Sequence, residues 1–145
     1  GTLDGANVEI LESVSEENFF LFGLKTPEVY ELRNHYNPVA IIQNSPDLTQ
    51  VMEKLETGYF NKKEPDIFND IINSLKSPHD PWMTLADFES YIQAQHQVAV
   101  AYQNQERWTK MSIINSARSG RFSTDRTMRE YNDDIWKLKP IEPIQ

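Results

Sequence analysis

Residues 1–10 read GTLDGANVEI, and this stretch decides the fold that we expect. Its pattern predicts the exit from a buried strand, then a tight turn, then a helix over residues 5–14. Asp4 stands where an N-cap is expected, since its carboxylate can accept a hydrogen bond from a free backbone N–H of the first helical turn. Gly5 allows the backbone to turn tightly at this junction. The start of the chain is therefore interpreted as a strand–turn–helix unit.

The strand that should lead into this turn is absent from the sequence, and the first residue is Gly1 rather than methionine. We therefore expect the chain to be the later part of a longer protein. Further along, residues 19–22 (FFLF) form a short, continuously apolar run. Such a run predicts a strand that is buried on both faces of a parallel sheet.

Most of the remaining sequence predicts helices. Their expected starts are Thr26 as an N-cap, Ser45–Pro46, Pro65 or Asp66, Asp87, the region of Trp108, and Ser123 or Thr124. Gly120 is expected to end a helix in the left-handed conformation. Residues 83–86 are expected to form a short strand or an extended link. Residues 137–145 include two prolines and are predicted to be a loose tail.

Composition limits the classes of function. The chain has 145 residues, of which 39% are hydrophobic and 11% aromatic, as expected for a folded domain with a core. There are no cysteines, so disulfides and thiolate metal sites are excluded and a reducing compartment is allowed. The net charge of −8 argues against nucleic-acid or anionic-membrane binding by the whole surface. No apolar run approaches the roughly 20 residues that span a bilayer, and the acidic start is not a signal peptide.

Six stretches carry a family resemblance when they are taken in order along the chain. They are GTLDGANVE (1–9), ENFFLFG (17–23), EPDIF (64–68), ADFESY (86–91), WTKMSI (108–113) and ARSGRFSTDRT (117–127). Together they resemble the C-terminal end of the α-glucan phosphorylases, which act on glycogen, starch and maltodextrin. The resemblance extends from Gly1 to about Trp136, and six stretches in register are far more specific than one short motif.

The resemblance implies an α/β fold. The chain is expected to be the mostly helical, distal part of the C-terminal Rossmann-like domain of a two-domain glycosyltransferase of the GT-B type. Residues 1–136 would form that part, with the strand–turn–helix start, the short buried strand and then the helices. Residues 104–136 are expected to cross back toward the first domain. The remainder of the phosphorylase chain is thus the first expected partner.

The resemblance also implies a reaction. These enzymes cleave the terminal α-1,4-linked glucose of a glucan with inorganic phosphate, giving α-glucose 1-phosphate with retained configuration. They use pyridoxal 5′-phosphate as an acid–base group. The lysine that carries this cofactor lies about ten residues upstream of the position that matches Gly1. We therefore expect no catalytic, cofactor-binding or metal-binding residue and no bound cofactor in this chain, which would be inactive alone. The parent enzyme is expected to be a cytoplasmic homodimer.

Three residues of the opening turn are candidate site residues. If the turn lies at the carboxyl end of a sheet strand, it lies where open α/β sheets bind ligands. Thr2, Asp4 and Asn7 could then support an active site from behind the groups that touch the substrate. The alternative is a turn with an N-cap and no further role, because the phosphate-binding spacings GxGxxG and GxxxxGK[ST] are absent.

The other candidate groups have mostly structural interpretations. His35, His79 and His96 form no metal-binding pair and are expected to be exposed or structural. A basic stretch between residues 107 and 129 is expected to pair with the many acids of the chain or with an adjacent domain. The alternative for this stretch is a phosphate contact through Arg121 and Arg126 beside a helix start.

Two functional hypotheses stay open. The chain is either an inert part of an α-glucan phosphorylase or a free-standing helical binding module derived from that domain. A different enzyme class ranks third, because no nucleophile elbow, metal set or cofactor loop is present in the sequence. The sequence upstream of Gly1 distinguishes the first two hypotheses.

Overall fold

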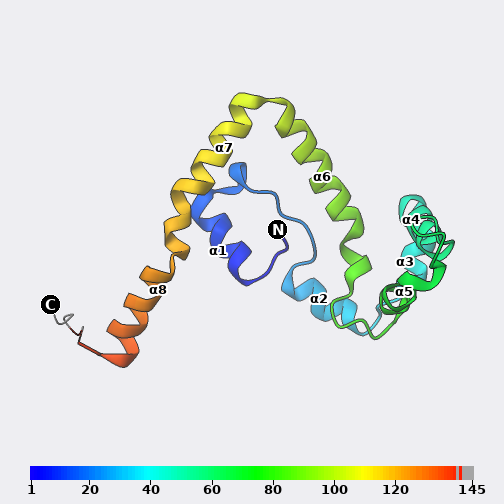
Figure 1. Cartoon of the computed structure of the whole chain (residues 1–145), viewed down its shortest axis with the longest axis horizontal. Coiled ribbons are helices and arrows are strands. Elements are labelled where there is room, and N and C mark those ends of the chain that lie inside the picture. Colours follow the sequence, from blue (N-terminus) through cyan, green and yellow to red (C-terminus); the bar gives the residue numbers. More distant parts are fainter. Residues whose placement is uncertain (140, 142–145) are drawn as a thin grey trace.

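The computed structural model describes residues 1–139 and residue 141. Within this part, the chain forms eight α-helices joined by loops and short 3-10 or π-helical turns (Figure 1). The α-helices are α1 (Gly5–Val14), α2 (Thr26–Arg33), α3 (Pro38–Asn44), α4 (Pro46–Glu56), α5 (Asn69–Lys76), α6 (Phe88–Gln103), α7 (Gln105–Arg118) and α8 (Thr124–Tyr131). No helix in this part of the chain is long and apolar enough to cross a membrane.

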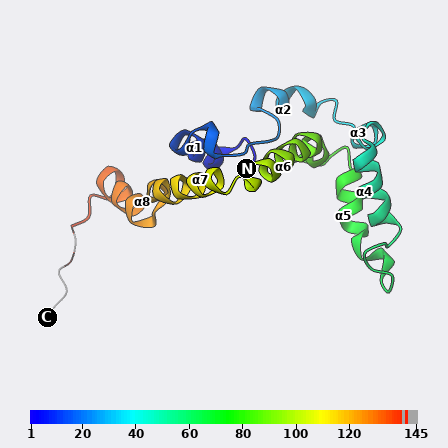
Figure 2. The same ribbon diagram turned by 90° about the horizontal axis from the view of Figure 1, so that it is seen from above.

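The two longest helices, α6 and α7, form a bent pair that organises the molecule (Figure 1). The first helix, α1, packs against α7 on the inner side of the bend. At the other end of α6, α3, α4 and α5 pack together, and α4 and α5 run side by side as an antiparallel pair (Figure 2). The α8 helix follows α7 and extends away from the group formed by α3, α4 and α5. The result is an open, elongated arrangement.

Local capping explains where several helices begin. The side chain of Ser45 accepts a hydrogen bond from the backbone N–H of Leu48 at 3.3 Å, and Pro46 follows as the first residue of α4. The side chain of Ser123 accepts in the same way from the N–H of Arg126 at 3.3 Å. The predicted starts of α4 and α8 are therefore confirmed.

Two expected caps are different in the structure. The N-cap of α2 is Lys25, whose N–H donates to the carboxylate of Glu28 at 2.7 Å, and Thr26 is already helical. Asp87 makes no capping hydrogen bond to α6 and instead accepts from the backbone N–H of Leu24 at 3.2 Å. The N-cap prediction for Thr26 was thus wrong, because Lys25 is the cap and Thr26 is the first helical residue. Asp87 does occupy the predicted N-cap position of α6, but its carboxylate bonds to Leu24 instead of to an N–H of the helix.

The predicted strand at residues 19–22 is also wrong. The described part of the chain contains no β-strand, only an isolated parallel bridge between Thr2 and Phe22. The N–H of Phe22 donates to the carbonyl of Gly1 at 3.1 Å, and the Gly1 amino group donates to the carbonyl of Phe20 at 2.8 Å. The backbone is extended as expected, but a ladder needs neighbouring strands, and none of the described residues supplies one.

Two turn predictions were wrong as well. Residues 83–86 are not extended: Met83 is left-handed at φ 49°, and a 3-10 turn follows over Thr84–Asp87. The carboxylate of Asp80 shapes this bend, since it accepts from the N–H groups of Trp82 and Thr84 at 3.0 and 2.8 Å. Gly120 is not left-handed either, because α7 runs on into a 3-10 turn over Ser119–Phe122.

The core is small. Its centre is the cluster of Leu48, Met52, Ile72 and Leu85, which joins α4 and α5 to the turn before α6. Partly buried side chains surround it: Ile41, Ile42, Leu55, Phe68, Leu75 and Phe88. The described start of the predicted tail is partly held, since Leu138 N–H donates to the side chain of Asn132 at 2.9 Å. The rest of that prediction, residue 140 and residues 142–145, lies outside the described residues.

The accessible surface is large for the mass. The chain of 16.9 kDa exposes 11452 Å², whereas a compact monomer of this mass exposes about 7,700 Å². The chain therefore buries far less of itself than an independent domain does. Many large apolar side chains, Trp82 and Val100 among them, are exposed.

Candidate functional site

The three candidate residues of the opening turn are hydrogen-bonded to one another. Thr2 Oγ1 donates to Asp4 Oδ2 at 2.8 Å. Asn7 Nδ2 lies 3.2 Å from Asp4 Oδ1 and 3.3 Å from Thr2 Oγ1 and donates to both. Asp4 occupies the N-cap position of α1 but makes no side-chain bond to a helix N–H, so its predicted capping bond is wrong. The carboxylate is used to tie the turn together instead.

Gly1 is part of the same arrangement. A Cβ atom at this position would lie 2.8 Å from the side chain of Asn7, closer than non-bonded atoms approach. A side chain at this position would therefore push the Asn7 side chain away from its present place beside Thr2 and Asp4. The sequence brings these residues together by local spacing, and the structure adds the close approach of Gly1.

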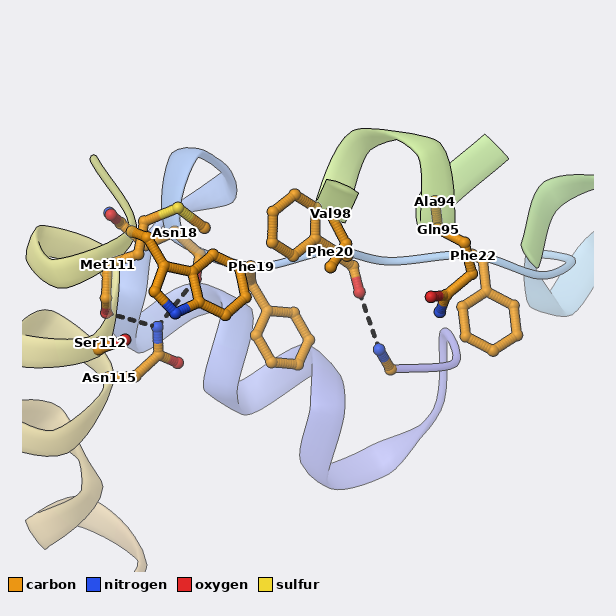
Figure 3. A pocket seen from close by; sticks show the side chains of 12 residues that line it. Asn18, Phe19, Phe20, Phe22, Ala94, Gln95, Val98, Met111, Ser112 and Asn115 are labelled. Carbon is orange, nitrogen blue, oxygen red and sulfur yellow. Dashed lines mark hydrogen bonds between the residues drawn. The ribbon is translucent and has the colours of Figure 1, made fainter. Parts of the chain in front are cut away.

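A cavity of about 340 Å³ opens beside this turn (Figure 3). Phe19, Phe20 and Phe22 of the extended segment form one wall. Gly1 and Asn18 also line it, and the remaining lining residues come from α6 and α7: Ala94, Gln95, Val98, Trp108, Met111, Ser112 and Asn115. The lining is mostly apolar, with a few amide and hydroxyl groups.

Asn115 fixes the wall of this cavity. Its side-chain Nδ2 donates to the carbonyl of Asn18 at 2.8 Å and to the carbonyl of Met111 at 2.9 Å (Figure 3). These bonds join α7 to the turn that follows α1. Sequence reasoning missed Asn115, because nothing local distinguishes an asparagine in mid-helix that reaches a carbonyl far away along the chain.

A second cavity of about 600 Å³ lies on the other side of Phe22. Thr2 and Asp4 line it together with apolar side chains of α4, α5 and α6, including Met52 and Phe88. The ring of Phe22 meets that of Tyr91 edge-on, with centroids 5.2 Å apart. Two of the three candidate residues thus line a largely apolar space.

A polar joint fixes the extended segment to α6. The N–H of Gly23 donates to Ser90 Oγ at 2.9 Å, and the N–H of Leu24 donates to Asp87 Oδ1 at 3.2 Å. Gly23 is left-handed at φ 95°, and a Cβ there would lie 3.1 Å from the Asp87 carboxylate. Burial raises the pKa of Asp87 above its usual range, and the hydrogen bond from Leu24 opposes this rise.

Two arginines of the basic stretch, Arg121 and Arg126, bond to groups of the same chain. Arg121 donates to Ser13 Oγ at 3.0 Å and lies 3.8 Å from the Glu12 carboxylate, so it links α1 to the turn after α7. Arg126 pairs with Glu130 at 2.7 Å and also donates to the carbonyl of Arg121 at 2.8 Å. These contacts favour the ion-pairing alternative over a phosphate site at the start of α8.

The predicted exposure of the histidines is confirmed, since His35, His79 and His96 all face solvent. Within the described residues, no three His, Asp or Glu side chains gather closely enough to hold a metal ion.

The position of the lysines tests whether this chain fits the cofactor that the resemblance implies. The eight lysines are exposed or half-buried, and none of them lines either cavity beside the opening turn. A lysine that holds pyridoxal phosphate as a Schiff base needs a desolvated position with a depressed pKa. The residues of this chain therefore do not fit the attachment of the cofactor.

Comparison with known proteins decides the family. A family model described as carbohydrate phosphorylase matches residues 1–138. The chain belongs to the carbohydrate phosphorylase family. It is 47% identical over 142 residues to a glycogen phosphorylase of Synechocystis sp. and 45% identical over 141 residues to the human muscle form. The rabbit muscle form (Oryctolagus cuniculus) is 44% identical.

These alignments cover 97% of this chain but only 17% of the length of each of these glycogen phosphorylases. The similarity therefore concerns one part of a much longer kind of protein. The region that matches the family model, residues 1–138, includes the opening turn and the residues that line both cavities.

Proposed function

We propose that this chain is the distal part of the C-terminal Rossmann-like domain of a GT-B type α-glucan phosphorylase. The parent enzyme removes terminal α-1,4-linked glucose from a glucan such as glycogen with inorganic phosphate, giving α-glucose 1-phosphate. The observation that carries this proposal is the match to glycogen phosphorylases over 97% of the chain and 17% of their length. We further propose that the parent is a cytoplasmic homodimer.

The open surface supports the remainder of the phosphorylase as the partner of this chain. The exposed area exceeds that of a compact monomer by about half, and the two cavities beside residues 19–22 are largely apolar. In a parallel ladder, polypeptide that precedes Gly1 would continue the pairing that Gly1 begins with Phe20 and Phe22. It would run alongside Phe19 and fill the first cavity.

The domain limits follow from the same proposal. Residues 1–136 belong to the second domain, residues 137–145 are its tail, and residues 104–136 reach back to the first domain. The α7 and α8 helices extend away from the core cluster (Figure 2), and this arrangement supports the crossing. A cofactor lysine upstream of Gly1 agrees with the absence of a suitable lysine around the two cavities.

The test of the proposal is phosphorolysis by the intact protein that the gene encodes. We expect glucose 1-phosphate from glycogen and phosphate, and we expect none from the 145-residue chain alone. After borohydride reduction, mass spectrometry should find the pyridoxyl group on a lysine outside residues 1–145. A pyridoxyl group on Lys25 or any other lysine of this chain would contradict the proposal. A gene that encodes only these residues would favour the free-standing binding module.

We propose that Thr2, Asp4 and Asn7 support the active site of the parent enzyme by holding the turn in shape. Replacing Asn7 with alanine removes the donor that bonds to both Thr2 and Asp4 and leaves only their direct hydrogen bond. In the intact enzyme, kcat/KM for glucan should fall by about tenfold, because small displacements of positioning groups slow catalysis. Asn73→Ala, an exposed change on α5, is the matched control and should leave kcat/KM unchanged. An unaltered kcat/KM in Asn7→Ala would show that the turn has only a structural role.

A further inference from the structure

The start of α6 holds the extended segment through two polar side chains. Ser90 Oγ accepts from the N–H of Gly23 at 2.9 Å, and Asp87 Oδ1 accepts from the N–H of Leu24 at 3.2 Å. The hydroxyl of Ser90 donates in turn to the carbonyl of Asp87 at 2.8 Å. Because its proton is used in this way, the oxygen of Ser90 is oriented to accept from Gly23. Two neighbouring N–H groups are therefore bonded to the start of one helix.

Two further contacts hold the segment in the same place. Tyr91 directly follows Ser90, and its ring meets the ring of Phe22 edge-on, with centroids 5.2 Å apart. Gly23 is left-handed at φ 95°, and a Cβ there would lie 3.1 Å from the Asp87 carboxylate. The backbone thus approaches α6 more closely than a residue with a side chain would readily allow.

The extended segment is bonded in turn to the opening turn. The N–H of Phe22 donates to the carbonyl of Gly1 at 3.1 Å, and Thr2 forms the parallel bridge to Phe22. Thr2 bonds to Asp4, and Asn7 donates to both of them. A continuous series of contacts therefore leads from α6 to the three candidate residues. Each contact joins two described residues, and none of them requires that a surface of this chain be free.

The opening turn depends on the extended segment for its hydrogen bonds to distant parts of the chain. Among the described residues, the bonds of this kind made by residues 1–4 go to Phe20 and Phe22. The start of the segment is fixed to α7, because Asn115 donates to the carbonyl of Asn18 at 2.8 Å (Figure 3). Its end is fixed to α6. A displacement of that end should therefore displace the turn.

We propose that Asp87 and Ser90 are positioning residues of the parent enzyme. They fix the end of the extended segment, and the segment fixes the turn that carries Thr2, Asp4 and Asn7. Neither Asp87 nor Ser90 is expected to touch the substrate. This inference rests on the proposed function and extends it, since it assigns a role in the reaction to side chains that lie far along the chain from the turn.

The test measures the formation of glucose 1-phosphate from maltoheptaose and phosphate by the intact phosphorylase. Asp87→Ala removes the acceptor of the Leu24 N–H, so kcat should fall about tenfold while KM for maltoheptaose changes by less than about twofold. Asp87→Asn keeps a side-chain oxygen that accepts from this N–H and should retain most of the wild-type kcat.

Glu89→Ala is the matched control. Glu89 lies in the first turn of α6, and its carboxylate accepts from Ser45 Oγ at 2.5 Å, which joins α6 to the start of α4. Its replacement removes a tertiary hydrogen bond to a carboxylate but leaves the extended segment in place. The kcat of Glu89→Ala should therefore equal that of the wild type. An equal loss of kcat in Asp87→Ala and Glu89→Ala would overturn the proposal, because the effect would then be general destabilisation.

A double variant distinguishes action through the opening turn from an independent effect. If Asp87 acts through the turn, Asp87→Ala/Asn7→Ala should lose about tenfold in kcat/KM, as each single variant does, because residues of one network are not additive. Two independent effects would multiply to a loss of about a hundredfold. That result would overturn the proposal.

Circular dichroism checks that each variant is folded, and Ser90→Ala replaces Asp87→Ala if that variant is not. A wild-type kcat in a folded Asp87→Ala enzyme would also overturn the proposal. If the wild type forms no glucose 1-phosphate, the proposed function fails. The connection from α6 to the turn is then judged by amide hydrogen exchange in the peptide of residues 1–10, which should be about fivefold faster in Asp87→Ala. Unchanged exchange in this peptide would overturn the connection.

Discussion

Replacing Leu48 with alanine should lower the free energy of unfolding around α4 and α5 by about 3 kcal/mol. Leu48 is 2% exposed and stands at the centre of the core cluster with Met52, Ile72 and Leu85. Its loss leaves a cavity that the surrounding helices cannot fully close. Amide hydrogen exchange, followed on peptides that cover residues 46–56 and 69–76, should become roughly 150-fold faster.

The matched control for this prediction is Val51→Ala. Val51 is on the same helix but is 42% exposed, so its truncation removes little buried surface. Exchange in the same peptides should change by less than about threefold. Equal effects of Leu48→Ala and Val51→Ala would mean that α3, α4 and α5 do not form the core described here.

Replacing Gly23 with alanine should destabilise the joint between the extended segment and α6 by about 2 kcal/mol. The φ of 95° is unfavourable for a residue with a side chain, and the new methyl group would press on the carboxylate of Asp87 at 3.1 Å. The hydrogen bonds to Asp87 and Ser90 should weaken together. Hydrogen exchange at the backbone amides of residues 23 and 24, compared between the wild type and the variant, measures how far these two hydrogen bonds weaken.

Gly5→Ala is the control for this backbone effect. Gly5 begins α1, and no atom lies within 4 Å of the position where its Cβ would be. Alanine there should leave stability unchanged or raise it by up to about 1 kcal/mol. If Gly23→Ala behaved like Gly5→Ala, the left-handed turn at the joint would have no energetic role.

The candidate site could be predicted only in part. Thr2, Asp4 and Asn7 are close in sequence, so the turn that brings them together is a local matter, and the structure shows them hydrogen-bonded. The far walls of the adjoining cavities come from helices distant along the chain, α6 and α7 for the first and α4, α5 and α6 for the second. No local pattern indicates that Asn115 reaches the carbonyl of Asn18.

Local sequence determined most of the helices. Their starts at Ser45 and Ser123 depend on side chains that bond to backbone groups three residues away, and such contacts form whatever the rest of the molecule does. The order of six short stretches likewise indicated the phosphorylase family, which the match over residues 1–138 shows. Both kinds of information are carried by neighbouring residues.

Tertiary structure alone decided the features that depend on a distant partner. The apolar run at residues 19–22 predicts a strand, but the described residues give it only one bridge, to Thr2. Asp87 stands at a helix start yet bonds to Leu24, and Asp80 bends residues that were expected to be extended. A strand requires another strand, and a carboxylate accepts from whichever donor the fold brings near. The sequence by itself determined the helices and the family, whereas the pairing of residues far apart in the chain required the assembled structure.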